Sequence, residues 1–163
     1  MNPDVLSSEL LTFLAILPVC LFIAYSDLKY MKIPNVAVLA TLVIFAVVGF
    51  ITLPTDAYLW RFVHFGVVLV IGFVLSAIGV LGAGDAKFAA AAAPFVAPSD
   101  IGVVLIILAL MGPVAIVLHR FGGRVGLNYM FPTWESWQRK RDFPFGFPLT
   151  VTLMFYLGIL AFS

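Results

Sequence analysis

The sequence is poor in charge and in cysteine. Of its 163 residues only 10% are charged, whereas 63% are hydrophobic and 16 are phenylalanine. A soluble domain carries about 25% charged residues, so this composition excludes an ordinary soluble protein and indicates a membrane protein. The single cysteine, Cys20, excludes an internal disulfide and a zinc site built from several cysteines.

The segment before the first apolar run lacks basic residues. It carries Asp4 and Glu9, the reverse of the positively charged region that begins a secretory signal. We therefore expect the first apolar run to be retained as a helix. The sequence also shows no internal repeat, no low-complexity tail and no soluble domain.

Long apolar runs are what the chain has in abundance. A hydrocarbon core about 30 Å thick needs about 20 apolar residues to be crossed as a helix. We predict an all-α, polytopic membrane protein with one membrane-embedded domain over residues 1–163. Its six expected spans are residues 10–26, 36–53, 60–81, 86–97, 101–119 and 147–162. The fourth is short, and its alanines favour burial among the other spans.

Basic residues follow alternate spans. They are Lys29 and Lys32 after the first span, Lys87 after the third, and Arg120, Arg124, Arg139, Lys140 and Arg141 after the fifth. The opposite side holds Arg61 together with Asp4, Glu9, Asp56 and Asp100. Because short cytoplasmic loops collect Lys and Arg, we expect both termini outside and the basic loops inside. The connection 121–146, with aromatic beside basic residues, is predicted to be an interfacial cytoplasmic loop.

Two aspartates, Asp27 and Asp85, stand at span ends on the same predicted face. Ionisable side chains near hydrocarbon are costly, and they suggest a functional site. Helix capping alone remains an alternative for Asp85, which precedes a helix. It fits Asp27 poorly, because an anion at a helix C-terminus faces the negative end of the dipole. If the two spans pack together, both carboxylates belong to one site.

Two close carboxylates share a proton, because both cannot easily ionise. One then activates a water as general base, while the protonated one hydrogen-bonds the scissile carbonyl. Gly82 and Gly84, on either side of Ala83, predict a break in the helical run just before Asp85. The pattern therefore favours peptide hydrolysis that needs no metal and no nucleophilic side chain.

Three stretches carry a resemblance to a known family. "GAGDAK" at 82–87, "SDLKYMKIPN" at 26–35 and "FPFGFPLT" at 143–150 resemble elements of the type IV prepilin peptidases, aspartic proteases of the bacterial inner membrane. The resemblance implies Asp27 and Asp85 as the catalytic pair and no cofactor or metal. The supporting motif residues would be Gly82, Gly84, Lys87, Ile33, Pro34 and Asn35.

The implied partners are prepilin or pseudopilin substrates and the lipid bilayer, with no nucleic acid. In this family a short basic leader is cut from the prepilin at the cytoplasmic face. Longer members carry a four-cysteine metal loop and also N-methylate the product. This chain has one cysteine, so it resembles the minimal, peptidase-only form associated with Flp, or tight-adherence, pili.

Several alternatives stay open. Within the enzyme interpretation, an archaeal preflagellin peptidase or another intramembrane protease with the same Gly-x-Gly-Asp motif is an alternative, although the Ile-Pro-Asn element favours the prepilin peptidases. A small proton or cation transporter could use Asp27 and Asp85 as a relay, although such a protein favours midplane carboxylates and repeated halves. A non-catalytic assembly subunit would need neither carboxylate. Lys87 could tune a carboxylate, bind a pilin glutamate or extend to the lipid head groups.

Overall fold

The structure is a computed structural model that describes residues 3–139 and 142–163. It is helical, without a β-strand among these residues. The α-helices are α1 (Pro3–Tyr30), α2 (Asn35–Thr52), α3 (Thr55–Ala77), α4 (Ala83–Ala92), α5 (Ile101–Arg124), α6 (Leu127–Met130), α7 (Glu135–Gln138) and α8 (Gly146–Phe162), with short 3-10 helices η1 (Ala93–Phe95) and η2 (Pro98–Asp100). The all-α membrane fold expected from the sequence is confirmed.

Four helical segments are long and apolar enough to cross a membrane. They are Ser8–Tyr30, Asn35–Thr52, Thr55–Ala77 and Pro98–Arg124. Helix α8 is apolar but shorter, with 17 residues. It reaches about 25 Å at 1.5 Å per residue, close to the hydrocarbon thickness.

The segment predicted as the fourth span is not one continuous helix. Residues 86–97 form most of the ten-residue helix α4, then η1, and then extended backbone at Val96. Proline has no N–H to donate to the preceding turn, and Pro94 lies where the α-helix gives way to η1. Helix α4 alone covers about 15 Å, half of a hydrocarbon core.

Small residues let α4 sit inside the bundle, as the alanine run predicts. Ala86, Phe88, Ala90 and Ala91 are buried. A Cβ added to Gly72 of α3 would lie 3.0 Å from the Cβ of Ala86, so α3 and α4 pack at close range. The helix that carries Asp85 is therefore held in place by its neighbours on several sides.

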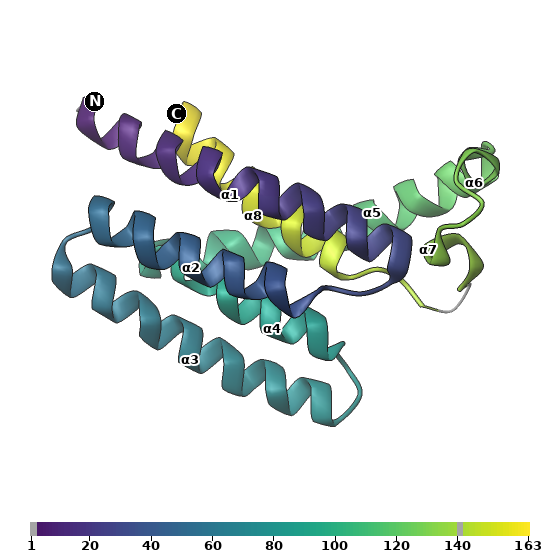
Figure 1. Ribbon diagram of the computed structural model, residues 1–163, viewed down its shortest axis with the longest axis horizontal. Coiled ribbons are helices and arrows are strands. Elements are labelled where there is room, and N and C mark those ends of the chain that lie inside the picture. The colour runs from purple at the N-terminus through teal and green to yellow at the C-terminus, as the bar shows by residue number, and fades with distance from the viewer. Residues whose placement is uncertain (1–2, 140–141) are drawn as a thin grey trace.

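The two ends of the bundle differ in what they contain. Both termini lie at one end, and the connections α1–α2, α3–α4 and α5–α8 lie at the other (Figure 1). The long α5–α8 connection forms α6 and α7 and folds back onto the bundle. Trp134 packs edge-on against Tyr25 of α1 at 6.1 Å, and Trp137 stacks on His119 of α5 at 4.0 Å between ring centroids.

Candidate active site

Asp27 lies in the last turn of α1 and is buried, with 4% of its surface exposed. Its Oδ2 accepts a hydrogen bond from the backbone N–H of Phe147, at 3.0 Å. Phe147 belongs to the first turn of α8. The first N–H groups of a helix have no partner within that helix, and they favour an anion beside them. The unfavourable position of Asp27 on α1 is therefore offset by the N-terminus of α8.

Gly146 permits this close approach. A Cβ at this position would lie 2.9 Å from Asp27 Oδ2 and 2.6 Å from Cδ1 of Ile33. Real side chains do not reach such distances without moving the neighbouring atoms. A larger residue at Gly146 would thus force the side chains of Ile33 and Asp27, or α8 itself, to move. The predicted element at 143–150 reaches the site through this glycine and through the N–H of Phe147.

Asp85 lies in the first turn of α4 and is half-buried. Its carboxylate bends back toward Gly82, where an added Cβ would come within 2.6 Å of Oδ2. Among the described residues Asp85 makes no hydrogen bond, so its carboxylate does not cap the helix through a backbone N–H. Burial, and after it the charge of Asp27, raise the pKa of Asp85 to about 7.

Ile33 packs between the glycine that precedes Asp85, Gly84, and the glycine beside Asp27, Gly146. Its side chain contacts the place where a Cβ of Gly146 would lie, and its Cβ lies 3.4 Å from the corresponding position at Gly84. The segment 31–34 between α1 and α2 thus packs against both α4 and α8. The structure brings together Asp27, Ile33, Gly84 and Gly146 at one end of the bundle.

The other predicted site residues lie at the start of α2 and on α4. Pro34 precedes the first helical residue, Asn35, as expected for residues that end a loop and start a helix. Lys87 Nζ donates a hydrogen bond to Asn35 Oδ1 at 3.2 Å. This bond links α4 to α2, and within the described residues Lys87 forms no ion pair with Asp85.

The predicted break before Asp85 is present, in a somewhat different form. Helix α3 ends at Ala77 and α4 begins at Ala83. The left-handed backbone lies at Gly79, with a φ of 76°, whereas Gly82 has a φ of −64°. Gly82 is needed for the close approach of the Asp85 carboxylate rather than for an unusual dihedral angle.

Two residues of the stretch 26–35 shape the site in ways that were not predicted. Ser26 is buried, and its hydroxyl donates to the carbonyl of Lys32 at 2.8 Å, which draws the segment after α1 back against the helix. Met31 adopts a left-handed φ of 52°, and its N–H donates to the carbonyl of Asp27 at 2.9 Å. Only glycine visits this region without cost, so a sequence pattern does not predict methionine there.

Comparison with protein families identifies the chain. The type IV leader peptidase family matches residues 14–117. The chain belongs to this family. Comparison with curated proteins and with solved structures gave no match. The matched region includes Asp27 and Asp85, whereas Gly146 and Phe147 lie beyond it. The chain is therefore a membrane peptidase of the leader-peptidase type.

The two aspartates of this leader peptidase lie in different surroundings. No group of three or more His, Cys, Asp or Glu side chains is placed to hold a metal ion in the described part of the chain. Asp27 is buried and has a hydrogen-bond donor, whereas Asp85 is more accessible and carries no such bond. Such different surroundings push two carboxyl groups toward different protonation states.

Proposed function

We propose that the chain is an aspartic endopeptidase in which Asp27 and Asp85 act together. The observation that carries the proposal is the pairing of a carboxylate held by the N-terminus of α8 with a second carboxylate whose pKa is about 7 because of burial and the charge of the first. The N–H of Phe147 stabilises negative charge on Asp27. Asp85 is therefore the group suited to carry the shared proton near neutral pH.

In the proposed mechanism, Asp27 is the general base. It takes a proton from a water molecule, which attacks the carbonyl carbon of the scissile peptide bond. The protonated Asp85 donates a hydrogen bond to the carbonyl oxygen, where negative charge develops. Asp85 then gives its proton to the leaving amine, and the pair returns to a singly protonated state.

We propose further that the substrate is a prepilin of the Flp type and that its leader is cut at the cytoplasmic face. The arrangement of charge supports cleavage at the cytoplasmic face. The end of the bundle that carries the site holds the C-terminus of α1, the start of α4 and the C-terminus of α5 (Figure 1). These segments and the α1–α2 connection contain Lys29, Lys32, Lys87, Arg120 and Arg124. Lys140 and Arg141, also predicted for this face, lie outside the described residues. Cytoplasmic loops are enriched in such residues. Product methylation is not part of the proposal, because the chain lacks the cysteine-rich loop of the methylating members.

The test is co-expression with a Flp-type prepilin, followed by gel electrophoresis for the shift that leader removal produces. The wild type is compared with Asp27→Asn, Asp85→Asn and Asp56→Asn. Asp56 is an exposed acid at the opposite end, so it controls for loss of one negative charge. We expect cleavage by the wild type and by Asp56→Asn alone, with all variants present in the membrane fraction.

The dyad variants are Asp27→Asn and Asp85→Asn. Cleavage that persists in both would contradict the aspartic mechanism. Cleavage of a preflagellin and not of the prepilin would keep the mechanism and replace the substrate. Mass spectrometry of the mature pilin is expected to show an unmethylated amino terminus. Proton flux through the wild type in liposomes, lost in either dyad variant, would favour the relay alternative.

A further inference from the structure

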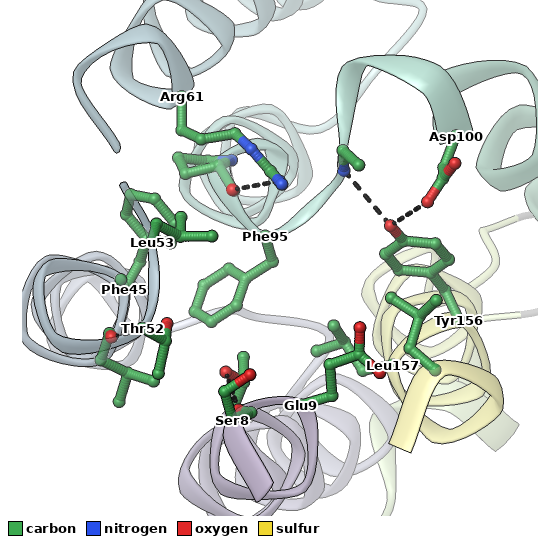
Figure 2. A pocket seen from close by; sticks show the side chains of 16 residues that line it. Ser8, Glu9, Phe45, Thr52, Leu53, Arg61, Phe95, Asp100, Tyr156 and Leu157 are labelled. Carbon is green, nitrogen blue, oxygen red and sulfur yellow. Dashed lines mark hydrogen bonds between the residues drawn. The ribbon is translucent and has the colours of Figure 1, made fainter. Parts of the chain in front are cut away.

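A second polar site lies at the other end of the bundle, away from Asp27 and Asp85. A cavity of about 290 Å³ opens there among α1, α2, α3, α8 and the segment between α4 and α5 (Figure 2). Its size is near the lower limit of small-molecule sites, which are about 300–1,000 Å³. The proposed mechanism uses no residue of this cavity.

Two charged side chains enter the cavity from different helices. Glu9 of α1 and Arg61 of α3 face it from opposite sides (Figure 2). Arg61 Nη1 donates to the carbonyl of Pro94 at 3.0 Å. A guanidinium has five N–H donors, so most remain for a ligand. Glu9 makes no hydrogen bond or ion pair with the described residues, which leaves its carboxylate to a ligand as well.

The third charged group of the cavity, the carboxylate of Asp100, already has hydrogen-bond donors. Asp100 accepts hydrogen bonds from the hydroxyl of Tyr156 and from Ser99, both at 2.8 Å. The same Tyr156 oxygen accepts from the N–H of Ala97 at 3.2 Å. Among the described residues, the cavity therefore combines a carboxylate without a partner and a guanidinium with one hydrogen bond with a second carboxylate that already accepts two hydrogen bonds. A purely anionic ligand would meet two negative side chains, whereas a zwitterion matches both free groups.

The depth of the cavity and its apolar wall point to a lipid. Thr52, in its lining, is the last residue of the candidate membrane span Asn35–Thr52. The end of a span lies where the hydrocarbon core meets the head groups. The remaining wall includes the buried side chains of Phe45, Phe95 and Leu157. A polar head between charged groups, continued by an apolar chain, fits this lining.

We propose that the cavity binds the head group of a zwitterionic phospholipid with a primary ammonium, phosphatidylethanolamine. The phosphate binds the free N–H groups of Arg61, and the ammonium binds the carboxylate of Glu9. Charge-assisted bonds of this kind are about twice as strong as neutral ones. The lipid would join the N-terminal part of α1 to α3. The site is independent of the proposed peptidase mechanism.

The test uses the purified full chain, stripped of lipid in detergent and studied by native mass spectrometry. Phosphatidylethanolamine, phosphatidylglycerol and phosphatidylcholine are added separately at equal concentration. We expect the ethanolamine lipid to bind about tenfold more tightly than either of the others, because only it offers both a phosphate and a hydrogen-bonding ammonium. Equal binding of the ethanolamine and glycerol lipids would overturn the proposal.

Two variants locate the site. Glu9→Gln keeps the shape of the side chain, and it is expected to remove the preference for the ethanolamine over the choline head group. Asp56→Asn, an exposed acid at the same end and outside the cavity, is expected to leave the preference unchanged. A preference that survives Glu9→Gln would contradict the proposal.

Arg61→Lys is a second test of the site, for the case that Glu9→Gln does not fold. The melting temperature of Glu9→Gln without added lipid shows whether that variant folds. Lysine keeps the positive charge but loses the planar fork that matches a phosphate. We expect weaker binding of the ethanolamine lipid, by about threefold to tenfold. Unchanged binding by Arg61→Lys would overturn the assignment of the phosphate to this residue.

Discussion

Both ends of the bundle place an aspartate against α8, but they satisfy it differently. At one end Asp100 accepts a hydrogen bond from Tyr156 of α8 at 2.8 Å, and Arg61 lines the same cavity. At the other end Asp27 accepts from the N–H of Phe147 at 3.0 Å, and its charged neighbour is the carboxylate of Asp85. An acid at a span end is thus compatible with a structural role. Among the described residues neither Asp27 nor Asp85 has an ion pair, and two such acids close together are costly, which is typical of a functional site.

The largest expected effect is the loss of cleavage when either aspartate of the candidate active site is replaced. Asp27→Asn and Asp85→Asn are each expected to lower the rate of leader cleavage by about a hundredfold or more, because each removes a group that handles a proton. The double variant should be little slower than the slower single variant, since the two act as one unit. Single-turnover cleavage of a purified prepilin measures this. Losses that multiply would mean that the two carboxylates act independently.

The close approach of α8 to Asp27 can be broken at Gly146. In Gly146→Ala the new methyl group would overlap Ile33 and Asp27, so we expect a loss of about 1–3 kcal/mol in unfolding free energy. Cleavage should fall as well, because the methyl group disturbs the hydrogen bond between the Asp27 carboxylate and the N–H of Phe147. Denaturant unfolding in detergent and the cleavage rate measure the two effects.

Gly158→Ala is the matched control, on the same helix. A Cβ there would lie 3.6 Å from Phe13 Cε2, an ordinary contact, so the change should be neutral or gain up to about 1 kcal/mol from helix propensity. Equal effects at both glycines would mean that the contact between Gly146 and Asp27 has no special role.

The pH dependence of cleavage tests which aspartate carries the proton. Burial and the charge of Asp27 raise the pKa of Asp85 to about 7. If the protonated Asp85 is the active form, the rate should fall as the pH rises through about 7. A rate that instead rises through this pH would assign the base to Asp85 and reverse the proposed roles.

The smallest effect is expected from the bond between Lys87 and Asn35. Lys87→Met removes one exposed hydrogen bond, which contributes about 0.5–1.5 kcal/mol at most to the stability of the fold. We expect a modest decrease in melting temperature and in cleavage rate. Lys32→Met, another exposed lysine at this end, is the control. A loss comparable to that of the dyad variants would place Lys87 among the reacting groups.

The features that the sequence predicted correctly are local ones. Long apolar runs and the two small-residue stretches, the "GAG" break and the alanines after it, are visible without tertiary information. They predict helices, a turn before Asp85 and a buried α4. The fourth span was harder, because apolar composition alone does not show that the α-helix ends at Ala92 and continues as η1.

The support of Asp27 could not be predicted from the sequence. The objection that an anion is unfavourable at the end of α1 is correct for an isolated helix. The donor that overcomes it, Phe147, is 120 residues away in the chain. Likewise, the bond from Ser26 to Lys32 depends on a left-handed methionine that no residue preference predicts. These contacts exist only once α1, α2 and α8 have packed.

The most direct test of a shared site is the titration of Asp85 with and without its neighbour. Infrared spectroscopy of the protonated carboxyl group follows it, and Asp85→Asn identifies the band. In the wild type the band should disappear around a pKa of about 7. In Asp27→Asn the pKa should be lower, though still raised by burial. An identical midpoint in both proteins would show that the two carboxylates do not interact, and it would contradict the dyad.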